Sequence, residues 1–263
     1  MAYNNYFHSG HAQVNGLSMY HEIHGQGGLP LVLIHGGGST IETTFGRILP
    51  LLAQKRQVIA LELQAHGRTG DRPTDLSFEQ DADDVAALLQ QLKIQKADFL
   101  GFSNGGQTTM EIVFRHPAII NKIILCSIFY KRSGTFPQFW DGFDQVTLHD
   151  MPKPLRDGFL AVNNNPTALT NSFNKDVQRM KLFRGWSDEQ IKSINVPTLV
   201  ISANNDVGSP EHAVEMYRLI PNAQLAIFPG GHGTYLGAIE ALENGQWPAF
   251  NATALIEGFL DQQ

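Results

Sequence analysis

The sequence has a single cysteine and no excess of positive charge. Cys126 is the only cysteine among 263 residues, so no disulfide can form within the chain. Its place at the end of the apolar run Ile123–Cys126 indicates a packing role. Lysine and arginine number 19 against 25 aspartates and glutamates, which gives a formal net charge of −6. Because proteins that bind nucleic acid present a basic face, this balance argues against a nucleic-acid partner.

Long hydrophobic runs are also missing. No apolar stretch approaches the roughly 18 residues that a membrane-spanning helix needs. The segment Met1–Tyr6 lacks the apolar centre of a secretory signal. We therefore expect a cytoplasmic protein without a membrane partner, built as one large domain with an insertion.

Short apolar runs alternate with helical segments along most of the chain. Strands are predicted at 12–14, 17–24, 31–34, 58–61, 97–102, 121–127, 198–202 and 224–228. The first two are joined by Asn15-Gly16, a typical tight hairpin turn. Continuous apolar strands separated by helices predict an α/β protein with a mostly parallel sheet covered on both faces.

The alternation stops between residues 129 and 193. This stretch has several prolines, no clear strand pattern, and ten of the chain's 25 aromatic residues. We interpret the stretch as a helical lid inserted into the core rather than as a second domain. The predicted organisation is a core of residues 1–128 and 194–263 with a lid at 129–193.

One serine stands between two glycines where an apolar run meets a helical one, in Gly101-Phe102-Ser103-Asn104-Gly105. A sharp turn from strand to helix forces its central residue into a strained conformation that presents the side chain above the sheet. The motif alone is weak, because a glycine-rich chain produces it by chance. Whether Ser103 is a nucleophile or an ordinary turn residue therefore depends on whether the chain also supplies a base and an acid beside it.

A serine nucleophile needs a histidine base and an acid that orients it. Among ten histidines, His232 follows the last strand, and loops after parallel strands gather on one rim with Ser103. His35 is better explained as a buried structural residue, and His66 is a weaker candidate. Asp206 follows the penultimate strand and is the predicted acid. If it were not, Glu62 or Asp150 would be considered next.

Backbone amides are the usual donors to the oxyanion that forms on an attacked carbonyl. The amide of Asn104 follows the predicted nucleophile at a helix N-terminus. The second donor is predicted at Gly37, in the loop His35-Gly36-Gly37-Gly38, with Gly38 as second choice and as a substrate contact. In the lid, Phe129 and Trp140 are predicted to line an apolar substrate pocket, although aromatic residues there could equally pack the lid onto the core.

These pieces together resemble the α/β-hydrolases, in particular the small esterase, lactonase and C–C hydrolase group. The resemblance rests on His35–Gly38, Gly101–Gly106, Asp206 and Gly231-His232-Gly233, and it covers nearly the whole chain except the lid. It implies an eight-stranded, mostly parallel sheet, a helical lid after the sixth strand, and no cofactor or metal. The chain departs from the group in the loop Leu61–Gly67 and at Ala203, where the group often has other residues.

The predicted function is a serine hydrolase that cleaves a small, fairly apolar carboxylic ester or lactone through an acyl-enzyme on Ser103. A C–C bond hydrolase, a thioesterase or a cofactor-free perhydrolase would carry the same triad. A non-enzymatic receptor for a small ligand on the same fold is the alternative from another class. The partner is a small molecule, and the protein is expected as a monomer or homodimer.

Overall fold

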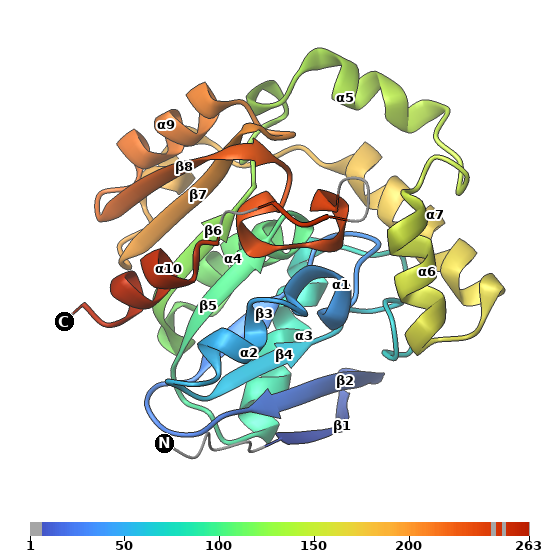
Figure 1. Ribbon diagram of the computed structural model, residues 1–263, viewed down its shortest axis with the longest axis horizontal. Coiled ribbons are helices and arrows are strands. Elements are labelled where there is room, and N and C mark those ends of the chain that lie inside the picture. The colour runs from blue at the N-terminus through green and yellow to red at the C-terminus, as the bar shows by residue number, and fades with distance from the viewer. Residues whose placement is uncertain (1–6, 243–245, 249–250, 263) are drawn as a thin grey trace.

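The computed structural model describes residues 7–242, 246–248 and 251–262, and an eight-stranded sheet runs through its centre (Figure 1). The strand order is β1-β2-β4-β3-β5-β6-β7-β8. β1 pairs antiparallel with β2, β2 antiparallel with β4, and the remaining neighbours are parallel. The strands are β1 (Phe7–Val14), β2 (Leu17–His24), β3 (Leu31–Ile34), β4 (Val58–Leu61), β5 (Ala97–Phe102), β6 (Ile120–Cys126), β7 (Thr198–Asn205) and β8 (Ala223–Gly231).

The first strand is longer than its sequence pattern predicted. The expected strand at 12–14 begins at Phe7, because β1 pairs with β2 along its whole length, from Phe7 opposite His24 to Val14 opposite Leu17. β1 forms the edge of the sheet, and its first half is mostly exposed and polar. An edge strand of this kind carries no apolar signal, so its backbone pairing could not be read from composition.

Helices cover both faces of the sheet, as expected for buried parallel strands. α3 (Phe78–Gln91), α4 (Asn104–Arg115) and α9 (Pro210–Leu219) contribute to the apolar cluster on one face. α1 (Ile41–Phe45), α2 (Leu49–Leu52) and α10 (Thr253–Leu260) contribute to the cluster on the other face. Alternate residues of β3 enter opposite clusters, Val32 and Ile34 in the first, Leu31 and Leu33 in the second.

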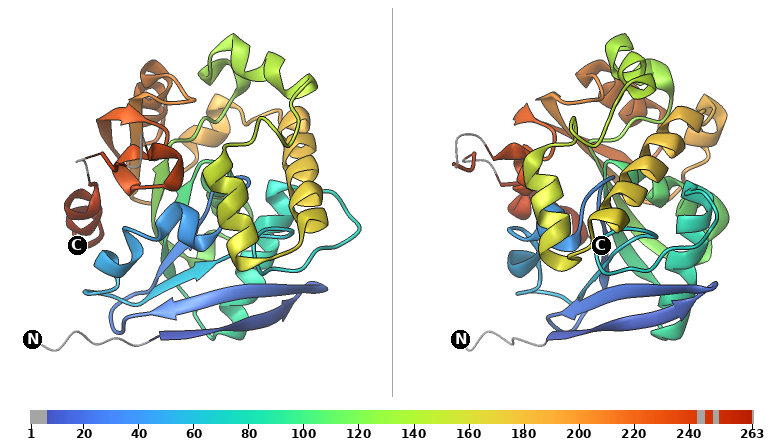
Figure 2. Two further views of the ribbon diagram at one scale, coloured as in Figure 1. Left: turned by 45° about the vertical axis from the view of Figure 1, so that its right-hand side comes forward. Right: turned by 90° about the vertical axis from the view of Figure 1, so that its right-hand side faces the viewer.

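The segment between β6 and β7, residues 129–193, is entirely described and contains helices and loops but no strand. In Figure 1, α5 lies at the top and α6 and α7 at the right, on the other side of the picture from α9 and α10. Turning the molecule keeps these helices together (Figure 2). The helices are η2 (Arg132–Gly134), α5 (Pro137–Asp141), η3 (Gly142–Asp144), α6 (Lys153–Val162), α7 (Pro166–Leu182) and α8 (Asp188–Lys192).

Three short helical turns complete the framework. η1 (Pro117–Ile119) links α4 to β6. η4 (Thr234–Leu236) and η5 (Ile239–Ala241) follow β8 and lead the chain from the end of the sheet toward α10. None of the described helices is long and apolar enough to cross a membrane.

Candidate active site

Ser103 occupies a strained turn between β5 and α4. Its φ of 52° and ψ of −126° lie in a region that residues with a side chain rarely adopt. The backbone is held there because the Ser103 amide donates to Cys126 O of β6 (2.9 Å) while its carbonyl accepts from Gly106 at the start of α4 (2.7 Å). The turn places the Ser103 side chain on the wall of a cavity.

Two glycines allow this turn to form. A Cβ added at Gly101 would meet Gly105 O at 2.3 Å, and one at Gly105 would meet Ile34 O of β3 at 2.1 Å. Both distances are far inside van der Waals contact, so only glycine lets α4 begin this close to the sheet. The glycine pattern therefore has a packing reason as well as a chemical one.

Asp206 and His232 form a hydrogen-bonded pair after β7 and β8. Asp206 Oδ1 lies 2.6 Å from His232 Nδ1, and the Phe102 ring packs against the imidazole with centroids 4.6 Å apart. Burial opposes charge on both groups. Even so, each partner holds the other charged, so the pKa of Asp206 is lowered and that of His232 is raised. Because Nδ1 is committed to Asp206, Nε2 is the nitrogen left for Ser103.

Two residues that the sequence did not single out as site residues support Asp206. Ser127, directly after β6, donates from Oγ to Asp206 Oδ2 and lies 2.7 Å from the Tyr235 hydroxyl. Ser127 has a positive φ of 54°, which turns its side chain toward the neighbouring loop. The backbone amides of Ala203 and Val207 also donate to Asp206 (3.1 and 2.8 Å). The signal in the sequence was position, because Ser127 directly follows β6, which lies between β5 and β7 in the sheet.

A cavity of about 460 Å³ brings the predicted residues together. Ser103, His232, Gly37 and Asn104 all line it, and Asp206 lies behind His232. The other walls come largely from the segment 129–193. The apolar side chains that line the cavity are Phe129, Phe139, Phe143, Val146, Met151, Pro152, Leu155, Phe173, Val177 and Met180 from this segment, and Val207 from the loop after β7.

The glycine loop lies against the start of α4. A Cβ at Gly37 would meet Asn104 Nδ2 at 2.5 Å, so a side chain at this position would force Asn104 to move. Gly38 also lines the cavity, but its amide donates to Asp176 Oδ2 (2.7 Å). Since that amide is already committed, Gly37 and not Gly38 remains the loop residue suited to donate to an oxyanion.

The two aromatic residues predicted for the pocket have different places. Phe129 is buried and lines the cavity. Trp140 is not among the lining residues: its ring packs behind Phe129, with centroids 5.5 Å apart, and its Nε1 donates to Arg132 O (2.9 Å). The expectation that Trp140 contacts substrate is therefore corrected for this cavity. Trp140 packs the segment 129–193 internally, because its N–H finds a backbone acceptor there.

A second aspartate–histidine pair lies beside the glycine loop. Asp176 of α7 accepts from His66 Nε2 (2.8 Å), and His66 Nδ1 donates to Gln64 O (2.8 Å). Asp176 also pairs with Arg179, which donates to Asp81 of α3 (2.6 Å). These four side chains, His66, Asp176, Arg179 and Asp81, form the buried charge network. It joins α7 to two elements of the core.

The network shifts the pKa of His66 and that of Asp176 in opposite directions. Burial disfavours the charged imidazolium, but the Asp176 carboxylate raises the pKa of His66 above its usual value. Burial likewise opposes ionisation of Asp176, yet His66, Arg179 and the Gly38 amide hold its pKa well below the usual range. With both ring nitrogens hydrogen-bonded, His66 has a structural role and is not placed to serve Ser103.

The remaining candidates are also accounted for. His35 is fully buried. Its Nδ1 donates to Gly36 O (2.7 Å), and its Nε2 accepts from the Leu63 amide (3.0 Å). Burial lowers the pKa of His35 to about 3. Glu62 is buried against Arg68 (2.9 Å), and burial raises its pKa to about 7. Asp150 lines the cavity but is bound to Thr147. None of the three bonds to His232 in the part of the chain that the structure describes.

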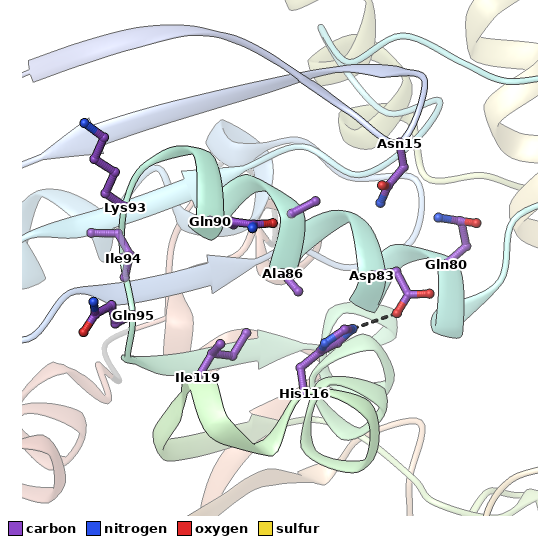
Figure 3. Close-up of a pocket in the computed structure, with 11 residues that line it drawn as sticks. Asn15, Gln80, Asp83, Ala86, Gln90, Lys93, Ile94, Gln95, His116 and Ile119 are labelled. Atoms are coloured by element: carbon purple, nitrogen blue, oxygen red, sulfur yellow. Dashed lines mark hydrogen bonds and ion pairs between the residues drawn. The ribbon is translucent and has the colours of Figure 1, made fainter.

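A second hollow, of about 1000 Å³, lies along α3 (Figure 3). The Asp83–His116 pair (2.7 Å) faces it together with amides such as Gln80 and Gln90. Its described lining residues include no serine, threonine or cysteine that could act as a nucleophile. Among the described residues, no group of three or more histidine, cysteine, aspartate or glutamate side chains is placed to hold a metal ion.

Comparison with known proteins identifies the fold family. A family model described as the alpha/beta hydrolase fold matches residues 30–181. The chain is 32% identical over 236 residues to an uncharacterized hydrolase of Bacillus subtilis, YugF, which covers 81% of this chain and 86% of that protein. The chain belongs to the α/β-hydrolase fold family.

Solved structures with the same fold include enzymes of different specificity. A meta-cleavage product hydrolase from Pseudomonas fluorescens IP01 superimposes with a TM-score of 0.76 at 22% identity, covering 97% of both chains. Est816, an N-acyl homoserine lactone degrading enzyme, gives a TM-score of 0.73 at 23% identity, covering 95% of this chain and 99% of its own. At these identities the likeness establishes the fold alone.

Proposed function

We propose that this protein is a serine hydrolase that cleaves a small, fairly apolar carboxylic ester or lactone. The observation that carries the proposal is the buried Asp206–His232 pair, which meets the strained Ser103 at one apolar cavity. Members of the family include lactonases, esterases and C–C hydrolases, so the fold is compatible with the proposal without selecting it.

The reaction follows from the roles that each position suits. His232 Nε2 takes the proton from Ser103 Oγ as that oxygen attacks the substrate carbonyl. The amides of Gly37 and Asn104 donate to the oxyanion, and the N-terminus of α4 adds a favourable dipole. The C–O bond to the leaving group breaks, and His232 returns the proton to the departing oxygen. Water, deprotonated by His232, then hydrolyses the acyl-enzyme.

Asp206 would act through His232. Its hydrogen bond fixes Nδ1 as the protonated nitrogen in the resting state and stabilises the imidazolium that forms during attack. Ser127, whose hydroxyl also contacts the Tyr235 hydroxyl, donates to the far oxygen of Asp206 and so restrains the carboxylate from rotating away from the imidazole. These contacts support positioning roles for Asp206 and Ser127 in the proposed reaction.

We propose further that residues 129–193 are a lid on a core of residues 1–128 and 194–263. In support, this segment supplies most of the apolar cavity wall, and the buried charge network attaches it to the core. The apolar lining favours acyl or alcohol groups without charge. A C–C hydrolase is the second candidate, because a meta-cleavage product hydrolase shares the fold over nearly the whole chain.

The proposal is tested by initial rates of the purified protein on a matched panel: a p-nitrophenyl ester, a lactone, a thioester and a vinylogous diketone. We expect the ester and the lactone to give the highest kcat/KM, with turnover abolished in Ser103→Ala. Cleavage of the diketone alone would favour the C–C hydrolase. Ligand-induced stabilisation without turnover on any member would favour a receptor.

A further inference from the structure

Glu240 is a carboxyl group in the cavity that the proposed hydrolytic steps do not use. It belongs to η5, the short turn that follows the His232 loop, and it lines the same cavity as Ser103. Its Oε2 is buried and has no hydrogen-bond partner among the residues that the structure describes. A buried polar atom without a partner is costly, so a ligand atom that reaches it gains a hydrogen bond that the free protein lacks.

The other two carboxyl groups of the cavity are already engaged. Asp176 is held by Gly38, His66 and Arg179. Asp150 is exposed and bound to Thr147, so water screens its charge. Glu240 is therefore the acidic group with a free oxygen and little solvent around it.

Positive charge is scarce on the cavity wall. The described lining residues include no lysine and no arginine, and His232 is the only titratable base among them. Arg179 and His66 lie behind Asp176, where their charges are offset by Asp176 and Asp81. A carboxylate entering this cavity would lose its water without finding an unpaired cation.

Resting on the function proposed above, we infer that Glu240 binds a hydrogen-bond donor on the substrate, such as a hydroxyl or amide N–H, and that the acidic cavity excludes esters with a free carboxylate. The hydrogen bond is available in either protonation state, because a carboxyl group always keeps at least one acceptor oxygen. Burial raises the pKa of Glu240 above its usual value, and His232 opposes that rise. The preferred substrate is thus an apolar ester or lactone that carries a neutral donor.

Phosphonylation of Ser103 tests this without knowledge of the natural substrate. The probes are three p-nitrophenyl alkylphosphonates of equal chain length that end in a methyl, a hydroxyl or a carboxylate group. The readout is the ratio of second-order labelling rates for the hydroxyl and carboxylate probes, compared within each protein. The matched control is Glu211→Gln, which makes the same charge change at an exposed position on α9.

We expect the wild-type protein to react at least about tenfold faster with the hydroxyl probe than with the carboxylate probe. Glu240→Gln should lower that ratio at least about fivefold, whereas Glu211→Gln should leave it within about twofold. Equal wild-type rates, or a ratio that Glu240→Gln does not change, would overturn the inference while leaving the hydrolase proposal intact. Failure of all three probes to modify Ser103 would instead overturn the proposed function itself.

Discussion

The two aspartate–histidine pairs beside the cavity differ in what their histidines can still do. In the Asp206–His232 pair, the imidazole side chain is 22% exposed and lines the cavity with Ser103. In the Asp176–His66 pair, the imidazole is fully buried and both of its nitrogens are hydrogen-bonded within the chain. In both pairs the carboxylate raises the pKa of its histidine, so the titration behaviour alone would not tell them apart.

The difference teaches that a perturbed histidine indicates chemistry only where one ring nitrogen remains available to a reacting group. His232 stands at the end of β8, on the rim where a ligand can enter. His66 stands where α7 meets the loop after β4, and its charge serves to fix α7. One pair would then control turnover and the other the attachment of the segment 129–193.

Substitutions of the two histidines should differ most in their effect on activity. His232→Gln should lower the rate of Ser103 acylation by about 10⁵-fold, since the nucleophile loses its base. His66→Gln should keep that rate within about tenfold of wild type, because neither nitrogen of His66 serves Ser103. Labelling by a fluorophosphonate measures both, with circular dichroism as the check on folding. Comparable losses in the two variants would remove the distinction between the pairs.

Substitution of Asp176, the aspartate of the second pair, should lower the stability of the protein. Asp176→Asn leaves Arg179 and His66 without their shared carboxylate, and breaking a buried ion pair costs about 3–5 kcal/mol in unfolding free energy. The control is Asp157→Asn in the exposed Lys153–Asp157 pair, where about 0–1 kcal/mol is expected. Urea denaturation of the three proteins gives the comparison. A loss for Asp176→Asn no larger than for the control would show that the network does not anchor α7.

Ser127 should have a smaller effect, confined to the catalytic pair. Ser127→Ala removes one hydrogen bond to Asp206 but leaves those from Ala203 and Val207. We expect kcat on an ester to fall about tenfold with KM nearly unchanged, because Ser127 orients the pair without contacting substrate. Ser127→Thr, which keeps the hydroxyl, should recover part of the loss. An unchanged kcat in Ser127→Ala would mean that the backbone amides suffice.

The pH dependence should show the smallest change. His232 must be neutral to accept the Ser103 proton, and its pKa is raised above the usual value of 6.5. Activity should therefore be lost as pH falls through a midpoint above 6.5. Asp206→Asn removes the negative charge that helps to raise this pKa, so the midpoint of its residual activity should move to lower pH. A midpoint that stays in place would mean that another group controls the acidic limb.

The positions that could be predicted from the sequence are those that directly follow strands. Ser103, Asp206 and His232 each lie just beyond a strand of a parallel sheet, and a parallel sheet gathers those positions on one rim whatever the details of packing. The same rule extends to Ser127, which directly follows β6.

Residues of the segment 129–193 could not be placed in the same way. Asp176 lines the cavity because α7 packs against α3 and the glycine loop. The residues around Asp176 show no pattern that predicts this packing. Phe129 and Trp140 are both aromatic, yet only Phe129 lines the cavity, because Trp140 is held by Arg132 O. Glu240 sits in a short turn without a periodic pattern. Such positions depend on tertiary packing, which the pattern of apolar residues does not encode.

The most direct measurement is peptide mass spectrometry after treatment with a fluorophosphonate. The proposed mechanism predicts one adduct, on the peptide that contains Ser103, in the wild-type protein and in His66→Gln. It predicts no adduct on that peptide in His232→Gln under the same conditions. An adduct on a different residue, or labelling of Ser103 that persists without His232, would contradict the assignment of the Asp206–His232 pair as the group that activates Ser103.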